Sequence, residues 1–401
     1  MSVRAEPAAG RSRLLERAAT AVLERALAGL EGGTLEVELP GGQVRRFGHG
    51  APVRLAIHDR AFFRRLATRG KLGFGESYTA EEWDSDDLVR LFELLLRNSD
   101  AAADRHARVR RLLELRPRLA RRNGFVRSRR NIAYHYDLGN DLFELMLDET
   151  MTYSCAVFSE PGMSLADAQR EKYRRLSNTL SLSREDHVLE IGCGWGGFAK
   201  YAAENYGCRV TGLTISREQA VVARERTAGL PVEIVEQDYR KVEGEFSKVV
   251  SIEMLEAIGE AQFGTYFATI DRVLAPGGRA AVQTILVPEQ RWERYRRSPD
   301  WIERYVFPGC LIPSLESLTR AAARDSRLAI YGVDEIGEHY AETLRRWRAS
   351  FHERLDDVRG LGYDRRFERT WDFYLAYCEA AFRTRALRDA QLLIGRAGSI
   401  G

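Results

Sequence analysis

Two features of the sequence predict an α/β fold in which a parallel sheet carries helices on both faces. From about residue 165 onward, short apolar runs alternate with segments of helical periodicity; the runs lie at residues 188–191, 209–213, 232–235, 249–252 and 279–285. A glycine-rich turn at residues 192–197 follows the first run and opens a helix. Strands that alternate with helices of this length form βαβ units, so we expect them to be parallel. The tail, roughly residues 338–395, is predicted to be helical.

A small α+β unit is expected before this pattern, over residues 1–115. Apolar residues follow helical spacing over residues 11–30, which predicts a helix. Apolar and polar residues alternate over residues 35–39 and end at a Pro-Gly-Gly turn, which predicts a strand. Residues 62–98 are predicted to be mostly helical, with an interruption at residues 73–78, where two glycines lie close together.

An arginine-rich stretch joins this unit to the α/β domain. Residues 105–130 contain eleven arginines and one acidic residue, Glu114. The stretch includes a proline and an Asn-Gly pair, both of which break helices. We therefore place an interdomain linker at residues 116–130 and the main domain at residues 131–401. The arginines can form a solvated helix face, or a patch for the phosphates of anionic lipid or nucleic acid.

The composition is that of an ordinary globular chain, with 44% hydrophobic and 30% charged residues. A net charge of +3 argues against a polyanion-binding protein as a whole. The five cysteines are scattered without a CxxC pair, so we expect neither a disulfide framework nor a metal site. The N-terminus lacks the pattern of a signal peptide, and no run approaches the roughly 20 apolar residues of a membrane span. We expect a cytoplasmic protein that at most associates peripherally with a membrane.

The glycine-rich turn suggests a ligand site at the end of the first strand. It carries the pattern E-x-G-x-G-x-G, formed by Glu190, Gly192, Gly194 and Gly196. Glycines let the backbone turn sharply and approach a ligand closely. The spacing differs from the G-x-G-x-x-G of dinucleotide sites, and the acidic residue suits a cationic aminoacyl ligand better than a pyrophosphate. The pattern resembles the S-adenosylmethionine loop of class I methyltransferases; the alternative is a tight turn without a ligand.

Two more strand ends belong to the same expected crevice, because open α/β sheets bind ligands beyond the carboxyl ends of their strands. Thr214 and Gln219 follow the second strand without the usual ribose-binding carboxylate, so hydroxyl and amide groups would replace it. Tyr239 follows the third strand and could cover an adenine ring. It could equally be a core or surface aromatic.

Across essentially its whole length, the chain resembles the cyclopropane-fatty-acid synthases and the related mycolic-acid methyltransferases. The motifs that carry this resemblance occur in order at residues 131–140, 152–156, 189–198, 212–219, 250–259, 307–310, 339–340 and 378–385. The N-terminal unit, with its motif at residues 73–78, resembles the extra domain that helps the longer bacterial enzymes act on membrane phospholipid.

The resemblance implies a role for each matching residue. The residues that would contact S-adenosylmethionine are Tyr153, Ser154, Gly192, Gly194, Thr214, Ile215, Gln219, Tyr239 and Arg240. Those that would surround the reacting carbon are Cys155, Ile252, Glu256, Gln283 and Tyr340. In the family this pocket holds a bicarbonate ion, proposed as the base. Cys378 matches a cysteine often assigned as the active residue, although the reaction needs no covalent enzyme intermediate.

The chemistry sets further requirements. The π electrons of an unactivated alkene must attack a sulfonium methyl group, and a carbocation then develops on the acyl chain. The site must hold the two at a near-attack distance of roughly 3–3.5 Å, exclude water and supply a base. Glu256 could serve as the anion or as the anchor of a base, or it could be an ordinary helix-start carboxylate. Cys155 could take part, or could be a small buried apolar residue.

The sequence departs from the best-known members at three positions around this pocket. Glu253 stands where they have glycine, Ala257 where they have histidine, and Gln283 where they have histidine. Glutamine is neutral, and two close carboxylates repel a bound anion, which puts the bicarbonate site in doubt. We therefore hypothesise that the proton acceptor differs, and that loss of a different proton would give a methylene-branched chain instead of a ring.

The expected function is the conversion of an unsaturated phospholipid to its cyclopropane form at the inner face of the cell membrane. One alternative is a methyltransferase for a soluble small molecule, which would not need the N-terminal unit. Another is a lipid-binding scaffold without activity, which would not need the retained site residues. A nucleic-acid methyltransferase would rest on the arginines alone, so we expect no nucleic-acid partner. The oligomeric state is left open between monomer and homodimer.

Overall fold

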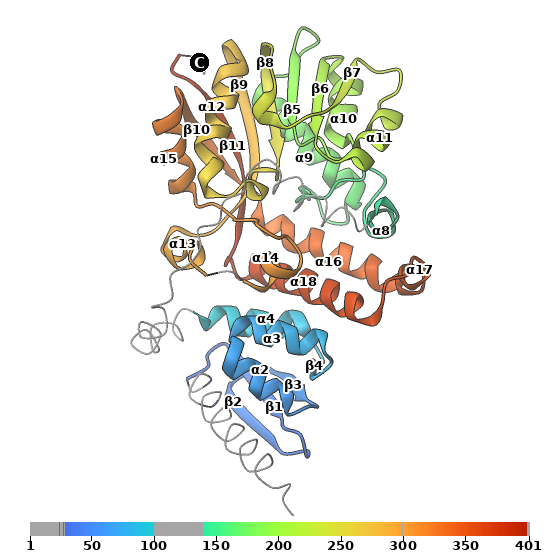
Figure 1. Cartoon of the computed structure of the whole chain (residues 1–401), viewed down its shortest axis with the longest axis vertical. Helices are drawn as coiled ribbons and strands as arrows, with labels where there is room; N and C mark the ends of the chain where they lie inside the picture. Colours follow the sequence, from blue (N-terminus) through green and yellow to red (C-terminus); the bar gives the residue numbers. More distant parts are fainter. Residues whose placement is uncertain (1–23, 25–26, 28, 100–138, 299, 399–401) are drawn as a thin grey trace, which may run out of the picture. The chain divides into compact units, whose positions relative to one another are not determined.

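The computed structural model describes residues 24, 27, 29–99, 139–298 and 300–398 (Figure 1). Most of the helix expected at residues 11–30 therefore lies outside the described residues. The linker expected at residues 116–130 lies outside them entirely. Contacts between Cα atoms divide the chain into two compact units, each of which is described by itself. Of the described residues, the first unit contains those up to residue 99 together with 363–384, and the second contains 139–362 and 385–398.

The first unit is an α+β structure built on a four-stranded sheet of order β2-β1-β3-β4. Its strands are β1 (Gly33–Glu38), β2 (Val44–His49), β3 (Pro52–Ile57) and β4 (Trp83–Ser85). Strands β1 and β3 are parallel, and the two outer pairings are antiparallel. Buried and half-buried residues alternate along β1, as the sequence pattern predicted.

The helices of this unit are α2 (Ala61–Arg69), α3 (Lys71–Thr79), α4 (Leu88–Arg97) and α18 (Arg365–Arg383). The expected interruption at residues 73–78 was wrong, because α3 runs through it and the break lies at Gly70, where φ is +53°. Gly73 is needed for close packing: a Cβ there would lie 2.1 Å from the carbonyl oxygen of Arg65 on α2.

Helix α18 packs against α3 and α4, although the sequence prediction placed its residues in the domain 131–401. Arg369 of α18 donates to the carbonyl oxygens of Tyr78 and Trp83. The hydroxyl of Tyr78 donates to Asp372 over 2.9 Å. These buried polar contacts tie residues distant in sequence into one core, which helical periodicity does not reveal.

The second unit contains a seven-stranded sheet of order β10-β11-β9-β8-β5-β6-β7, which confirms the α/β prediction. The strands are β5 (His187–Ile191), β6 (Arg209–Thr214), β7 (Val232–Glu236), β8 (Phe246–Ile252), β9 (Leu274–Leu286), β10 (Leu328–Glu335) and β11 (Arg388–Arg396). The pairs from β9 through β8, β5 and β6 to β7 are parallel, and β11 is antiparallel to both β9 and β10.

The prediction that the tail is helical was only partly right. Helices α16 (Gly337–Glu353) and α17 (Leu355–Gly360) are present, but β11 is a strand. Its residues 389–392 are buried between two neighbouring strands. Strands buried on both faces show no period-two alternation, so a short apolar run cannot be told from a helix by pattern alone.

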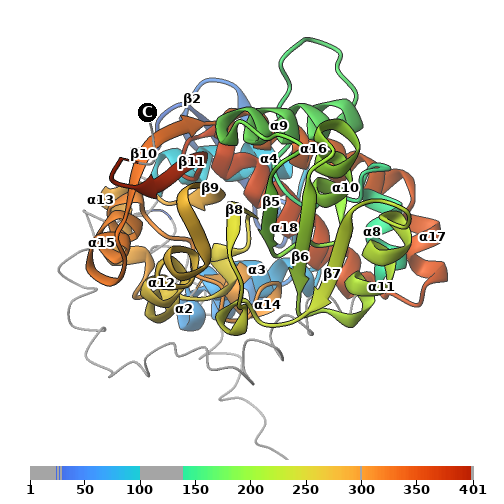
Figure 2. The same ribbon diagram turned by 90° about the horizontal axis from the view of Figure 1, so that it is seen from above.

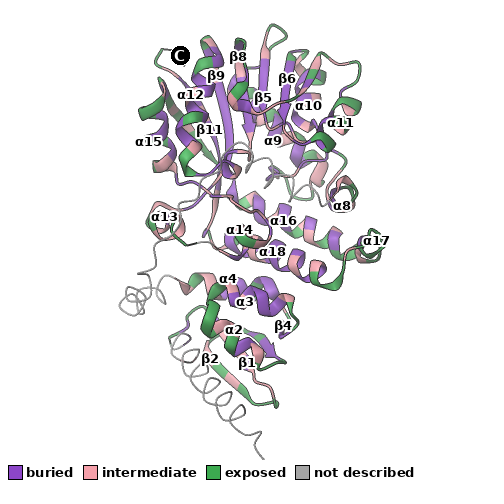
Figure 3. Cartoon of the chain, viewed as in Figure 1, coloured by how far each residue is buried: buried purple, intermediate pink, exposed green. Residues whose placement is uncertain are grey.

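Helices cover both faces of this sheet (Figure 2). Apolar residues of α9 (Leu165–Leu180) and α10 (Gly197–Tyr206) form one core layer, and those of α12 (Phe263–Val273) and α15 (Leu315–Asp325) form another. Figure 3 shows the strands buried between these layers. The remaining helices are α8 (Asn140–Met146), α11 (Arg217–Arg226), α13 (Glu289–Tyr295), α14 (Trp301–Tyr305) and the short turns η1 (Tyr239–Lys241), η2 (Leu255–Ala257) and η3 (Glu260–Gln262).

Candidate cofactor and reaction site

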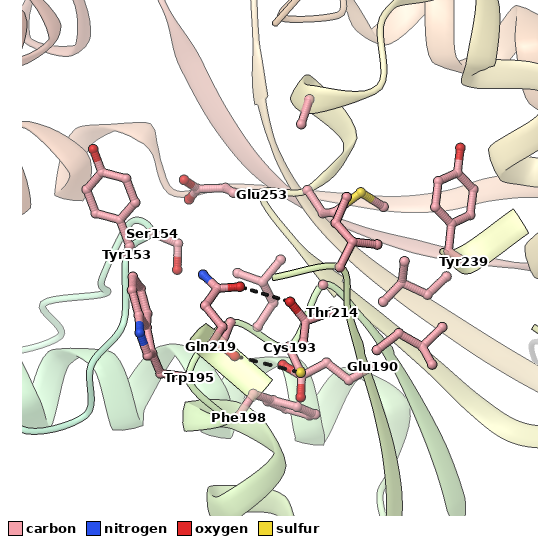
Figure 4. A pocket seen from close by; sticks show the side chains of 18 of the residues that line it. Tyr153, Ser154, Glu190, Cys193, Trp195, Phe198, Thr214, Gln219, Tyr239 and Glu253 are labelled. Carbon is pink, nitrogen blue, oxygen red and sulfur yellow. Dashed lines mark hydrogen bonds between the residues drawn. The ribbon is translucent and has the colours of Figure 1, made fainter. Parts of the chain in front are cut away.

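A cavity of about 180 Å³ opens at the carboxyl ends of β5, β6 and β8 (Figure 4). The strand order reverses between β5 and β8, and such switch points are where open α/β sheets bind ligands. The cavity brings together most of the residues expected to contact the cofactor: Tyr153, Ser154, Glu190, Gly192, Gly194, Thr214, Ile215, Gln219, Tyr239 and Arg240. Further lining residues, which the sequence did not single out, include Gln237, Asp238, Met254 and Gln262.

The glycine-rich turn has the backbone geometry that the sequence predicted. Gly192, Gly194 and Gly196 have φ of +83°, +52° and +81°, a region where only glycine is unstrained. A Cβ at Gly192 would also lie 2.7 Å from the Met254 side chain. Gly196 does not line the cavity; it is the N-cap residue of α10. The turn therefore exposes backbone groups to the cavity.

Glu190 supplies the acidic group at the end of β5. Its side chain is buried yet lines the cavity, and the backbone N–H of Ala199 donates to it. Among the described residues, no hydrogen-bond donor pairs with its Oε2. Burial raises the pKa of Glu190 to about 8. A cationic ligand would favour the ionised form of this carboxyl, so the group suits an aminoacyl sulfonium.

The second strand end is built from hydroxyl and amide groups, as expected. The hydroxyl of Thr214 donates to Gln219 Oε1 over 3.0 Å, a bond drawn in Figure 4. Because its oxygen is held in this way, Gln219 can present its NH₂ group as a donor. Ser216 caps α11 by accepting from the backbone N–H of Gln219. The local fold thus fixes the amide without using a carboxylate.

The third strand end carries Tyr239, on the opposite side of the cavity from Tyr153 and Trp195 (Figure 4). Its ring is 8% exposed and packs edge-on against Tyr266, with centroids 5.8 Å apart. The two sequence interpretations of Tyr239 are therefore compatible, because the ring belongs to the core and also lines the cavity. Arg240 is held by Asp238 through bonds of 2.8 and 2.5 Å.

Three residues expected around the reacting carbon donate hydrogen bonds to Glu253, which the sequence marked only as a departure. Its Oε1 accepts from the backbone N–H of Cys155 and from Gln283 Nε2, both over 2.8 Å. Its Oε2 accepts from the hydroxyl of Tyr340 over 2.6 Å. Glu253 lines the cavity. Both oxygens of this carboxyl group are therefore held in place by hydrogen bonds.

Glu253 occupies this place at a conformational cost. Its φ of +49° lies in the left-handed region, which costs a non-glycine residue about 1–3 kcal/mol. The geometry explains why glycine would suit the position and why a glutamate there is informative. The sequence did mark Glu253, as a carboxylate where related enzymes have glycine. The motif could not show that the hydrogen-bond donors of three other residues meet at this side chain.

Glu256 is placed differently from the expectation. Its Oε1 accepts from the hydroxyl of Thr284 and the backbone N–H of Ile285 on β9. Burial, and then the nearby Glu253, raise the pKa of Glu256 to about 8. The residue is absent from the cavity lining, whereas Glu253 is part of it. The structure thus presents Glu253, rather than Glu256, to a ligand.

The two candidate cysteines differ in setting. Cys155 is fully buried, and burial raises the pKa of its thiol well above the ordinary value. A neutral thiol is a poor nucleophile, so the side chain fits the interpretation as a small buried residue, while its backbone N–H holds Glu253. Cys378 lies on α18 of the first unit and does not line the cavity.

A buried polar group beside Glu253 was missed by the sequence interpretation. Lys172 of α9 is buried and donates to the hydroxyl of Ser154 over 2.6 Å. Burial lowers the pKa of Lys172 to about 8. A signal existed, because Lys172 interrupts the helical stripe formed by Ala168, Leu176 and Leu180. Asp389 and Gln391 of β11 also lie here, and they escaped notice because the strand itself was not predicted.

Known sequences give the family context of this site. Residues 125–392 match the family model described as mycolic acid cyclopropane synthetase. The chain is 41% identical over 361 residues to a tuberculostearic acid methyltransferase of Mycobacterium tuberculosis, covering 87% of this chain and 84% of the relative. It is 35% identical over 346 residues to the cyclopropane-fatty-acyl-phospholipid synthase of Escherichia coli, covering 86% of this chain and 88% of the relative.

Solved structures agree with these sequences. A cyclopropane synthase of Mycobacterium tuberculosis aligns with a TM-score of 0.62 and 26% identity, covering 66% of this chain and 97% of that one. A mycolic acid cyclopropane synthase in complex with SAH and CTAB aligns with a TM-score of 0.61 at 26% identity, with coverages of 66% and 97%. A coclaurine N-methyltransferase, 18% identical with a TM-score of 0.60, shares the fold alone.

Proposed function

The chain belongs to the mycolic acid cyclopropane synthetase family, and we propose that it transfers the methyl carbon of S-adenosylmethionine to the double bond of an unsaturated phospholipid acyl chain. Its fold is that of the class I, Rossmann-like methyltransferases, and it is an enzyme of the S-adenosylmethionine-dependent, lipid-modifying kind. The observation that carries the finer proposal is the Glu253 carboxylate, held by three donors at the cavity wall.

The residues of the cavity fit S-adenosylmethionine, which supplies an electrophilic methyl group when it is bound. The glycine-rich turn admits a ligand close to the backbone. Glu190 offers a carboxyl oxygen without a donor among the described residues, a match for a cationic group. Gln219 presents an amide whose oxygen is already held. Together these groups would hold the cofactor in the cavity that Glu253 also lines.

Glu253 would then serve as the catalytic base. When the alkene attacks the methyl group, a carbocation forms on the acyl chain, and an adjacent carboxylate stabilises that positive charge. Glu253 would take a proton from the methylated chain: a C–H bond breaks, an O–H bond forms, and the freed electron pair closes a C–C bond. Positioned proton transfer of this kind contributes roughly 10²–10⁴-fold to a rate.

A bound bicarbonate does not fit these residues. Cys155 N, Gln283 Nε2 and the hydroxyl of Tyr340 all point their hydrogens at Glu253. A second anion would lose these donors and would face the negative carboxylate. We infer that the chain carries its proton acceptor as a side chain, and no step requires an added ion.

The proposed product is a cyclopropane fatty acid, and a methylene-branched chain is the alternative. A base fixed to the backbone at residue 253 reaches only those hydrogens that the cavity presents to it. Loss of a proton that forms a C=C bond instead of a ring would give a methylene-branched chain. The substrate and the Glu253 position are shared by both products, so the first test must separate them.

The proposed substrate is a phospholipid at the inner face of the cell membrane. Among the described helices, none combines the length and the apolar character needed to cross a bilayer. The eleven arginines at residues 105–130 suit an anionic surface by their charge, since each arginine near such a surface contributes about 1 kcal/mol.

The test is lipid mass spectrometry of a bacterial host that expresses the chain and is rich in monounsaturated phospholipid. We expect acyl chains heavier by one CH₂ group, which a ring and a methylene branch share. Ozonolysis distinguishes the two, because only the branched chain contains a C=C bond. The Glu253→Gln variant is the control and should leave the acyl chains unaltered. Unaltered lipids with the unmodified chain, together with methylation of a soluble compound, would refute the proposal.

A further inference from the structure

One buried carboxyl group beside the proposed base has no role in the mechanism above. Asp389 lies on β11 and is fully buried. Its strand position is fixed by the backbone, since Ile336 N donates to its carbonyl oxygen over 2.8 Å. Its Oδ2 lies 3.5 Å from Gln283 Nε2. No donor among the described residues pairs with its Oδ1.

Asp389 and Glu253 form a pair. The NH₂ group of Gln283 donates to Glu253 over 2.8 Å and also contacts Asp389, so one amide joins the two carboxyls. The two carboxyl groups are also close enough to interact with each other. A hydrogen bond between carboxyls requires one proton, because two ionised carboxylates at that distance repel.

The surroundings of the pair decide which carboxyl carries the proton. Glu253 accepts hydrogen bonds from three donors. Asp389 has the long contact to Gln283, and the thiol of Cys155 also lies close to its carboxyl group. Burial, and then the proximity of Glu253, raise the pKa of Asp389 well above its ordinary value. The proton therefore belongs on Asp389, whose O–H donates to Glu253.

The other titratable groups around the pair come from four elements. They are Lys172 on α9, the thiol of Cys155 in the loop before α9, Glu256 on η2 and Tyr340 on α16. Burial raises the pKa of Glu256 to about 8 and lowers that of Lys172 to about 8. Near neutral pH, Lys172 is thus mostly a cation and Glu256 is mostly uncharged.

We propose that Asp389 is a positioning residue for the proposed reaction: its carboxyl carries a proton, donates it in a hydrogen bond to Glu253, and so fixes the pair at a single negative charge. The inference rests on the proposed role of Glu253 as the base. The pair holds one proton before the reaction and two afterwards, when the C–H proton has become an O–H on Glu253. One proton must then leave to solvent before the next turnover.

The shared proton has a consequence for the pH profile. At low pH the pair takes its second proton, and the base is lost. At high pH Asp389 loses its proton; Glu253 then loses a donor and gains a like charge beside it. The two limbs of the profile belong to the pair rather than to either residue. A variant with a permanent neutral donor at position 389 should therefore keep the acid limb and lose the pair's contribution to the alkaline limb.

The first test is infrared difference spectroscopy of the cofactor-free full chain, which needs no turnover. The unmodified protein should show the C=O stretch of a protonated carboxylic acid near neutral pH, and Asp389→Asn should remove part of that band. Glu253→Gln should make the Asp389 band titrate at lower pH, because the neighbouring charge is gone. Asp334→Asn, at an exposed carboxyl on the adjacent strand β10, is the control and should leave the band unchanged. A band that Asp389→Asn does not alter would overturn the proposal.

The second test is the pH dependence of turnover on unsaturated phospholipid vesicles. Asn can donate to Glu253 as the protonated Asp does, so Asp389→Asn should keep most of the activity and extend it to higher pH. Asp389→Leu removes the donor and should lower kcat roughly 10-fold or more, with the KM for S-adenosylmethionine unchanged. An unchanged alkaline limb in Asp389→Asn would count against the pair.

The two tests separate this inference from the proposed function. If the infrared band depends on Asp389 and Glu253 but no lipid is methylated, the carboxyl pair is supported and the proposed reaction is rejected. If lipid is methylated but the infrared band is the same in Asp389→Asn as in the unmodified protein, the reaction is supported and the shared proton is rejected.

Discussion

The two halves of the cavity are built in different ways. The cofactor half depends on backbone conformation, with three positive-φ glycines, a cap on α11 and one buried carboxyl, Glu190. The reaction half depends on hydrogen bonds that reach Glu253 from the backbone of a loop and from side chains of a helix and the sheet. The comparison teaches that the first half can be recognised as a local motif, whereas the second exists only when distant segments meet. It also predicts that changes in one half should leave the other largely intact.

The largest expected effect comes from Glu253→Gln. The amide keeps the size of the side chain but cannot accept a proton, so turnover should fall by roughly 10²–10⁴-fold. Affinity for S-adenosylmethionine, measured by calorimetry, should stay the same. A similar loss of cofactor affinity would show that the two halves are not separable.

Tyr340→Phe should have the next largest effect. It removes the hydroxyl that donates to Glu253 over 2.6 Å, and a hydrogen bond to a charged group is worth about 1.5–3 kcal/mol, or roughly 10- to 100-fold in rate. The steady-state kcat for lipid methylation is the measurement. Tyr331→Phe, at an exposed tyrosine on β10, is the matched control and should behave like the unmodified chain.

Gly192→Ala tests the cofactor half. The left-handed backbone alone should cost about 1–2 kcal/mol, and the new Cβ would collide with Met254, so affinity for S-adenosylmethionine should fall by roughly 5- to 30-fold or more. Gly229→Ala provides the control, because Gly229 has a similar φ of +81° but open space around its Cβ. Equal losses in both variants would mean that strain, rather than the close approach to the cofactor loop, is responsible.

Glu190→Gln should give the smallest effect, visible in the pH dependence of binding. The pKa of Glu190 is raised to about 8 in the free protein, and a bound cation would lower it. Binding below that pH must therefore expel a proton, so affinity should rise with pH by up to about tenfold per unit and level off above about pH 8. Calorimetry in buffers of different ionisation enthalpy would detect the proton. Proton release that persists in Glu190→Gln would assign it to another group.

The sequence by itself determined the α/β class, the positions of the parallel strands along the chain and the cofactor loop. These features depend on local rules: apolar periodicity reports burial, and E-x-G-x-G-x-G reports a turn that only glycine can make. Local rules also found Cys155, Gln283 and Tyr340 through motif resemblance, and flagged Glu253 as an exception.

Only the tertiary structure decided what these residues do together. It showed that Glu253, not Glu256, faces the cavity, that α18 packs with the N-terminal unit, and that the tail contains a buried strand bearing Asp389. The physical reason is the same in each case. The hydrogen bonds concerned join residues that lie far apart in the sequence. How the strands and helices pack decides which of these residues meet, and no local pattern encodes that packing.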